Sequence, residues 1–173
     1  MKARILLLNI FFLSGMVKLS AQSPMQNFKK YAGDWTADII MWMGANEPPM
    51  KDEVQVHIEM KMNDLFLASQ YKGTVMATPY EGLGILGYDL QRNLYVNSFI
   101  DNMNSGIQYT EGTSGDNGKT IELHGKVFDG NSQQEVPLRE VVTFADDNHE
   151  KIEFFATTNG TETKTMEIDL VRR

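Results

Sequence analysis

Five acidic residues lie within or at the ends of predicted strands and have the chemistry needed for proton transfer. They are Glu81, Asp89, Asp101, Glu111 and Glu140. Two carboxyl groups that meet inside a fold can act as general acid and general base. A hydrolase or isomerase that uses interior Glu81, Glu111 or Glu140 is therefore one hypothesis. The alternative is that these carboxylates are solvated on the outer face or pair with partners at strand ends.

Arg139 and Glu140 are neighbours on one predicted strand, so one of the two must point towards the interior. A buried guanidinium is normally matched by a carboxylate from the protein or from a ligand. Arg139 therefore has two interpretations. It binds an anionic or carboxylate-bearing ligand, or it forms an internal ion pair with Glu111 or Glu81.

Other catalytic and metal-binding chemistry has no motif in this sequence. The histidines are His57, His124 and His149, and none has the spacing of a metal site or a serine partner. There is no cysteine, which excludes thiol chemistry and disulfides. The glycines of Gly82 to Gly87 precede no helix, so they do not form a phosphate-binding loop. We expect no metal, no cofactor and no catalytic signature.

The elements that must position these residues are predicted to be strands. Val54, Val56 and Ile58 alternate with polar residues, the period of a strand with one buried face. Turns rich in Asn, Asp and Gly separate ten such segments, which predicts consecutive hairpins closing into an up-and-down antiparallel all-β barrel. The segments are 34–43, 51–62, 65–76, 80–89, 93–100, 106–114, 119–128, 135–145, 150–157 and 162–172. Residues 24–31 are predicted to form a short helix before the first strand.

Methionines and aromatic residues predict what fills the barrel. Met41, Met43 and Met60 fall on inward positions, and thioether side chains adapt to varied ligands. A mostly apolar pocket with a few directed polar groups is expected, although a methionine-rich core explains the same pattern. The candidate ligand-binding residues are Met41, Met43, Met60, Tyr71, Glu81, Tyr88, Phe99, Tyr109, Glu111 and Arg139.

Trp35 and Arg172 are predicted to close the barrel at one end. Gly33-Asp34-Trp35 begins the first strand, and Arg172 lies on the inward face of the last. A cation over an aromatic ring contributes about 0.5–2 kcal/mol. A Gly-x-Trp at this place, covered by an Arg near the chain end, is similar to the arrangement in calycin-type barrels, the lipocalins and fatty-acid-binding proteins.

A set of short motifs spans the chain in a fixed order. They are Met41-Trp42-Met43, Glu81-Gly82-Leu83-Gly84, Gly87-Tyr88-Asp89, Ile100-Asp101-Asn102-Met103, Glu111-Gly112, Arg139-Glu140 and Lys164-Thr165-Met166-Glu167. Together they resemble the DUF1579 family over about residues 28 to 172. The resemblance implies a calycin-like barrel and no established activity.

The first 21 residues read as a secretory signal peptide. Lys2 and Arg4 precede an apolar run that ends in small residues before Ala21. The run is too short for a membrane span, which needs about 20 apolar residues. We therefore expect a single exported domain, residues 22–173, in the periplasm or secreted, with no membrane span after cleavage.

The net charge and one predicted surface residue limit the classes of binding partner. Loss of Lys2, Arg4 and Lys18 would leave 13 of the 16 basic residues against 23 acidic ones, so the net charge would change from −7 to −10. Such a chain is not expected to bind nucleic acid. We expect a binding protein for a small apolar or amphipathic molecule, in one version anionic. A third hypothesis is a structural or interaction domain, because outward Trp42 would mark a contact patch or homodimer surface.

Overall fold

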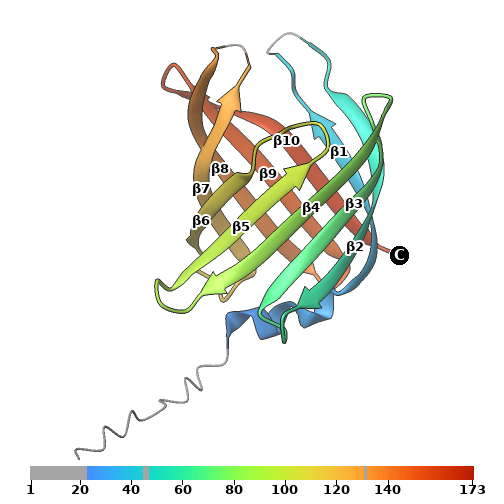
Figure 1. Ribbon diagram of the computed structural model, residues 1–173, viewed down its shortest axis with the longest axis vertical. Helices are drawn as coiled ribbons and strands as arrows, with labels where there is room; N and C mark the ends of the chain where they lie inside the picture. The colour runs from blue at the N-terminus through green and yellow to red at the C-terminus, as the bar shows by residue number, and fades with distance from the viewer. Residues whose placement is uncertain (1–22, 45–46, 131) are drawn as a thin grey trace, which may run out of the picture.

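The chain folds into a short helix followed by ten strands (Figure 1). The computed structural model describes residues 23–44, 47–130 and 132–173, and the predicted signal peptide lies outside them. The elements are η1 (Pro24–Tyr31), β1 (Gly33–Met41), β2 (Met50–Lys61), β3 (Phe66–Val75), β4 (Thr78–Asp89), β5 (Leu94–Asp101), β6 (Gln108–Thr113), β7 (Thr120–Asp129), β8 (Gln134–Asp146), β9 (His149–Thr158) and β10 (Thr161–Arg172).

The ten strands form one closed antiparallel barrel. Each strand pairs with its neighbours in the chain, and β1 pairs with β10 to complete the circle. The alternation in β2 shows why the sheet curls around an interior. Val54, Val56 and Ile58 are buried inside, while Gln55 and His57 between them are exposed outside. The predicted up-and-down barrel is confirmed, and each of the ten described strands pairs with a neighbour on both sides.

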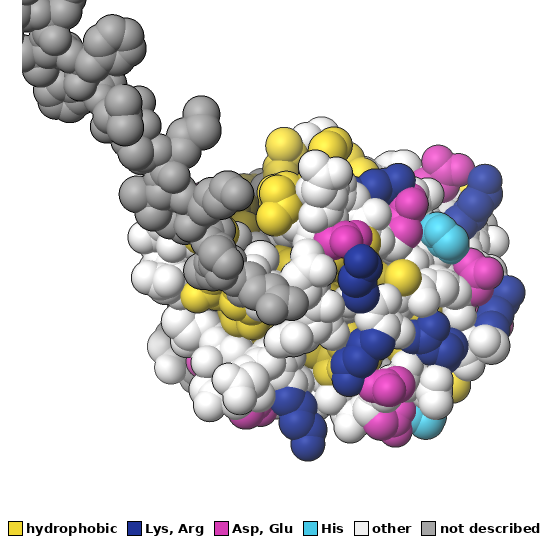
Figure 2. Space-filling model, turned by 90° about the horizontal axis from the view of Figure 1, so that it is seen from below, with side chains coloured by type: hydrophobic (Ala, Val, Ile, Leu, Met, Phe, Trp, Pro, Cys, Tyr) yellow, Lys and Arg dark blue, Asp and Glu magenta, His cyan; other side chains and the backbone are white. Residues whose placement is uncertain are grey.

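Helix η1 covers one end of the barrel (Figure 1). It is a 3-10 helix, in which residues three apart lie on the same face, so Met25, Phe28 and Tyr31 are all buried. The ring of Phe28 packs edge-on against Phe144, with centroids 5.0 Å apart. Figure 2 shows basic and acidic side chains interspersed on this end of the molecule. The aromatic cluster makes this end a closed floor.

Trp35 and Arg172 join the first and last strands of the barrel at this floor. They are direct partners in the β1–β10 register, and the Arg172 guanidinium lies 4.7 Å from the centre of the Trp35 ring. Arg172 also donates hydrogen bonds to the carbonyl oxygens of Lys30, Ala32 and Asp147. Gly33 adopts a φ of 142°, and a side chain there would collide with Arg172. Gly33, Trp35 and Arg172 thus lie together where β1 pairs with β10.

Candidate functional site

A cavity of about 490 Å³ occupies the barrel interior between the floor and the opposite end. Met43, Met76 and Met103 line it, and each is at least 41% exposed. They lie at or just beyond the ends of β1, β3 and β5 away from η1. The cavity therefore opens through a mouth lined by methionines, opposite the floor.

The walls of the cavity are mainly apolar. Ile39, Leu67, Val142 and Ile152 line it from β1, β3, β8 and β9. All are buried, because each stands on the inward face of an alternating strand. An apolar guest would thus exchange water for hydrocarbon contact over most of its surface.

Tyr71 and Phe99 form an aromatic pair on one wall. Their rings meet edge to face, with centroids 5.7 Å apart. Gly84 faces them from β4, and a Cβ there would lie 3.5 Å from the Phe99 ring, an ordinary contact. Burial raises the pKa of the Tyr71 hydroxyl well above its ordinary value. Tyr71 is thus a neutral hydroxyl inside the barrel.

Glu140 is the most deeply buried acidic residue of the described chain, with 2% of its surface exposed. The hydroxyl of Thr110 donates a hydrogen bond of 2.7 Å to its Oε2, and the amide of Asn97 donates one of 3.0 Å to its Oε1. Burial raises the pKa of Glu140, and these two donors oppose that effect. Glu140 is a wall carboxyl whose two oxygens already have partners.

Glu150 is a second buried carboxyl in the same cavity. It is 8% exposed, and its Oε2 has no hydrogen-bond partner in the described part of the chain. Burial, together with the charge of Glu140, raises the pKa of Glu150 from 4.5 to about 8. Glu150 is not among the site residues predicted from the sequence. The signal was its shared face with Ile152 and Phe154, both buried.

The charge of the cavity is one-sided. Asp101, Glu140 and Glu150 line it, and among the described lining residues there is no Lys, Arg or His. Asp101 lies near the mouth, where its Oδ1 accepts hydrogen bonds from the backbone of Met103 and Asn104. The described lining of this cavity therefore carries acidic groups without a basic side chain to pair with them.

Comparison with known proteins identifies the family. The model of the family described as "Protein of unknown function (DUF1579)" matches residues 20–172. This chain belongs to the DUF1579 family. None of the curated proteins is significantly similar to it.

Two solved structures resemble this DUF1579 chain. Rv2717c from M. tuberculosis is 16% identical, with a TM-score of 0.60 over 87% of this chain and 97% of that chain. A redesigned β-barrel is 14% identical, with a TM-score of 0.41 over 83% of this chain and 92% of that chain. At 16% identity, the likeness to Rv2717c supports the barrel fold and nothing further.

The DUF1579 barrel brings together part of the predicted ligand-binding set. Met41, Met43, Tyr71 and Phe99 line the interior cavity. Met60 and Tyr88 do not line it, although both pack against the core. The ring of Tyr88 packs edge-on against Tyr95, 4.9 Å between centroids, near the floor. These two residues support the barrel below the cavity.

Arg139 points outwards, so the expectation of an interior guanidinium is wrong. Its Nη2 lies 2.6 Å from Glu162 on β10, and its guanidinium stacks 4.0 Å from the centre of the Phe155 ring. The reason is hydrophobic: Leu138 and Val142 share the face of Glu140, and burying them turns Arg139 to the outside.

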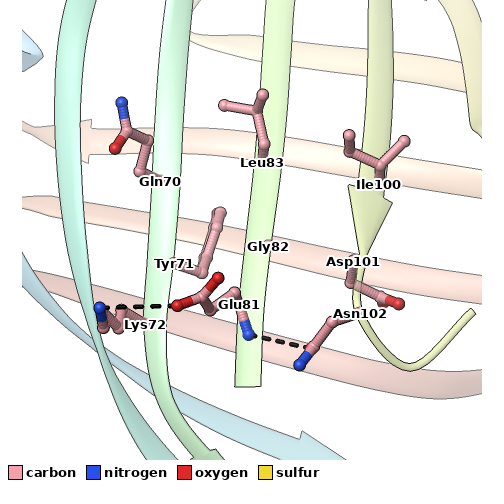
Figure 3. A pocket seen from close by; sticks show the side chains of 9 residues that line it. All are labelled: Gln70, Tyr71, Lys72, Glu81, Gly82, Leu83, Ile100, Asp101 and Asn102. Carbon is pink, nitrogen blue, oxygen red and sulfur yellow. Dashed lines mark hydrogen bonds and ion pairs between the residues drawn. The ribbon is translucent and has the colours of Figure 1, made fainter. Parts of the chain in front are cut away.

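Glu81 also lies outside the barrel, where it was expected inside. Its Oε1 is 3.5 Å from Nζ of Lys72, and its side chain is 70% exposed. It borders an outer hollow of about 500 Å³ across β3, β4 and β5, in which Gln70, Leu83 and Ile100 lie in a row (Figure 3). The glycines beside Glu81 take the inward positions on this strand.

Tyr109 and Glu111 form a polar cluster on the outer face of β6 instead of lining the interior. The Tyr109 hydroxyl donates a hydrogen bond of 2.8 Å to Glu111, and Arg92 forms a 2.6 Å ion pair with the same carboxylate. These contacts lower the pKa of Glu111. The inward residue between them is Thr110, the partner of Glu140.

Trp42 stands at the end of β1, half-buried. The ammonium of Lys164 lies 5.9 Å from the centre of its ring. Within the residues that the structure describes, no three His, Cys, Asp or Glu side chains lie close enough together to hold a metal ion. No helix in the described ranges is long and apolar enough to cross a membrane.

Proposed function

We propose that this DUF1579 protein binds a small, mostly apolar molecule inside its barrel. The observation that carries the proposal is the interior cavity of about 490 Å³ with apolar walls and an open mouth. A cavity of this size lies in the range of small-molecule sites, roughly 300–1,000 Å³. Burial of apolar ligand surface contributes about 25 cal/mol per Å².

The mouth supports a binding role over a merely structural one. Met43, Met76 and Met103 are partly exposed at the rim, and flexible thioether side chains can move aside and repack around a guest. Tyr71, Asn97 and Gln108 are polar groups that orient a ligand within these walls. An anionic guest does not suit the site, because Asp101, Glu140 and Glu150 line it and the lining residues that the structure describes include no Lys, Arg or His.

The test is to incubate the purified mature protein with a lipid extract and identify bound molecules by native mass spectrometry. Gly84→Leu extends a side chain into the cavity, where the first added carbon meets the Phe99 ring at an ordinary contact distance. The matched control Gly115→Leu adds the same side chain on the surface, with nothing within 4 Å. Binding that Gly84→Leu leaves unchanged would refute an interior site.

The interior carboxyl groups favour a second candidate function, acid–base catalysis in a hydrolase or isomerase. Glu150, with a pKa of about 8, would supply a proton at neutral pH, and Glu140 is the other carboxyl in the same cavity. A panel of hydrolase and isomerase substrates tests this candidate. Any turnover must be lost in both Glu150→Gln and Glu140→Gln while folding is retained.

The place of action is also part of the proposal. The basic residues, apolar run and small residues of positions 1–21 support export with cleavage after Ala21. N-terminal sequencing of the protein recovered from cell fractions and from the medium tests it. A chain that retains residues 1–21 would contradict cleavage.

A further inference from the structure

The interior cavity has an unmet electrostatic requirement. Glu150 is more than nine-tenths buried, lines the cavity, and has an oxygen without a hydrogen-bond partner in the described chain. A buried polar group without a partner costs about 1–3 kcal/mol in proteins. Natural folds usually avoid this cost by pairing the group, so an unpaired carboxyl that lines an open cavity indicates a ligand group.

Glu140 does not share this requirement, although it lies in the same cavity. Thr110 and Asn97 already donate hydrogen bonds to its two oxygens. Asp101 has backbone donors at the mouth. Glu150 is thus the one lining carboxyl of the described residues that lacks a donor from the protein.

The position of Glu150 fixes how a guest would lie. Glu150 is opposite Leu170, which is opposite Ala37 of β1, whereas Met41 near the mouth is opposite Met166. Ala37 and Met41 are four residues apart, about 13 Å along a strand. A guest with its polar head at Glu150 therefore extends an apolar body towards the methionines of the mouth.

We propose that the cavity selects apolar molecules that carry one protonated amine, with the ammonium group placed at Glu150 and the hydrocarbon chain directed towards the mouth. This proposal rests on the proposed binding function and specifies its ligand class. A charge-assisted hydrogen bond from an ammonium to a buried carboxylate is short and strong. An anion at the same place would be repelled by Glu140 and Glu150.

Binding of an ammonium group must be coupled to the release of a proton. Glu150 has a pKa of about 8 without ligand, so at lower pH it must ionise to pair with a cation. Affinity for the ammonium should then rise up to about tenfold for each pH unit between pH 6 and 8 and level off above. The other titratable groups among the described residues that line the cavity are Tyr71, Tyr80, Asp101 and Glu140. The pKa of both tyrosines is raised, so they stay neutral in this range.

The test compares three probes of equal chain length, decylamine, decanol and decanoate, by isothermal titration calorimetry at pH 6, 7 and 8. We expect decylamine to bind at least tenfold more tightly than decanol at pH 8, with decanoate weakest. Glu150→Gln should remove this preference and its pH dependence while decanol affinity is retained. Glu53→Gln, on the exposed outer face of β2, is the matched control and should behave as wild type.

Each other outcome overturns the inference. If decanol binds as tightly as decylamine, or decanoate more tightly, the amine preference is wrong and the binding function stands. If Glu140→Gln removes the preference and Glu150→Gln does not, the assigned partner is wrong. If none of the three probes binds, the amine inference is overturned, and the lipid-extract experiment decides the binding function. If Glu150→Gln fails to fold, proton release by the wild-type protein, measured in buffers of different ionisation enthalpy, decides: no release at pH 7 refutes the proposal.

Discussion

Glu150 makes the stability of the barrel depend on pH in a predictable direction. Its carboxyl ionises near pH 4.5 in the unfolded chain and near pH 8 in the barrel. Between these values the folded protein binds more protons than the unfolded chain, so stability falls as pH rises. The loss is absent below pH 4.5 and complete above pH 8.

The size of the effect follows from the same two values. At about 1.4 kcal/mol per pH unit, a pKa change from 4.5 to about 8 destabilises the ionised barrel by up to about 5 kcal/mol. Between pH 5.5 and 8.5 the change is about 3 kcal/mol. Glu150→Gln removes the ionisation. The free energy of unfolding of the variant minus that of wild type should therefore be about 3 kcal/mol higher at pH 8.5 than at pH 5.5.

Urea denaturation followed by tryptophan fluorescence at pH 5.5 and pH 8.5 measures this difference. The comparison between variant and wild type cancels the titration of groups that both proteins share. Exposed Glu53→Gln is the control, and its difference from wild type should not change with pH. If the difference in free energy of unfolding between Glu150→Gln and wild type changes by less than about 0.5 kcal/mol from pH 5.5 to pH 8.5, the buried ionisation of Glu150 is refuted.

Three further predictions concern the floor and the outer face. Arg172→Ala removes the cation over Trp35 and three hydrogen bonds to backbone carbonyls, and should lower the free energy of unfolding by about 2–4 kcal/mol in urea; a loss below 0.5 kcal/mol contradicts the closure argument. Phe28→Ala empties the aromatic floor and should cost about 3–5 kcal/mol, seen as a lower Tm; an unchanged Tm would show that η1 is dispensable. Arg139→Ala removes contacts on the outer face, the ion pair with Glu162 and the stacking on Phe155, and should leave decanol and decylamine affinities within twofold by calorimetry, whereas a larger change would place Arg139 in the binding route.

The fold could be predicted from local alternation because each strand has one wet and one dry face. Val54, Val56 and Ile58 show this alternation clearly. The same alternation predicts that Trp35 on the first strand and Arg172 on the last strand face inwards. Their partnership was predictable because a closed meander must pair its first strand with its last.

The interior polar residues were harder to predict, because parity marks two faces without saying which is inside. On β4 the inward positions include Gly82 and Gly84, which carry no hydrophobic signal, while the outward face carries Leu83 and Ile85. The pattern there is inverted, and Glu81 was assigned to the wrong side. On β8 more apolar residues share the face of Glu140 than the face of Arg139, which favours Glu140 as the inward residue. Arg139 was nevertheless predicted to lie inside because a guanidinium could bind an anionic ligand.

Glu150 was missed for a different reason. It stands at the start of β9, next to the turn after Asp146, where polar residues are usually solvated. In this barrel that turn lies at the floor, where Asp147 contacts both Lys30 and Arg172. The cover supplied by η1 is a tertiary feature that the local sequence does not contain.

The seam between β1 and β10 has a consequence for the order of folding. Trp35 pairs with Arg172, 137 positions later in the chain, so this contact can form only after the ribosome has added Arg172. Earlier hairpins can assemble while synthesis continues, but the barrel stays open until β10 pairs with β1. Contacts this distant in sequence slow folding, so the nascent chain should pass through a stage with two unpaired edges exposed to other chains.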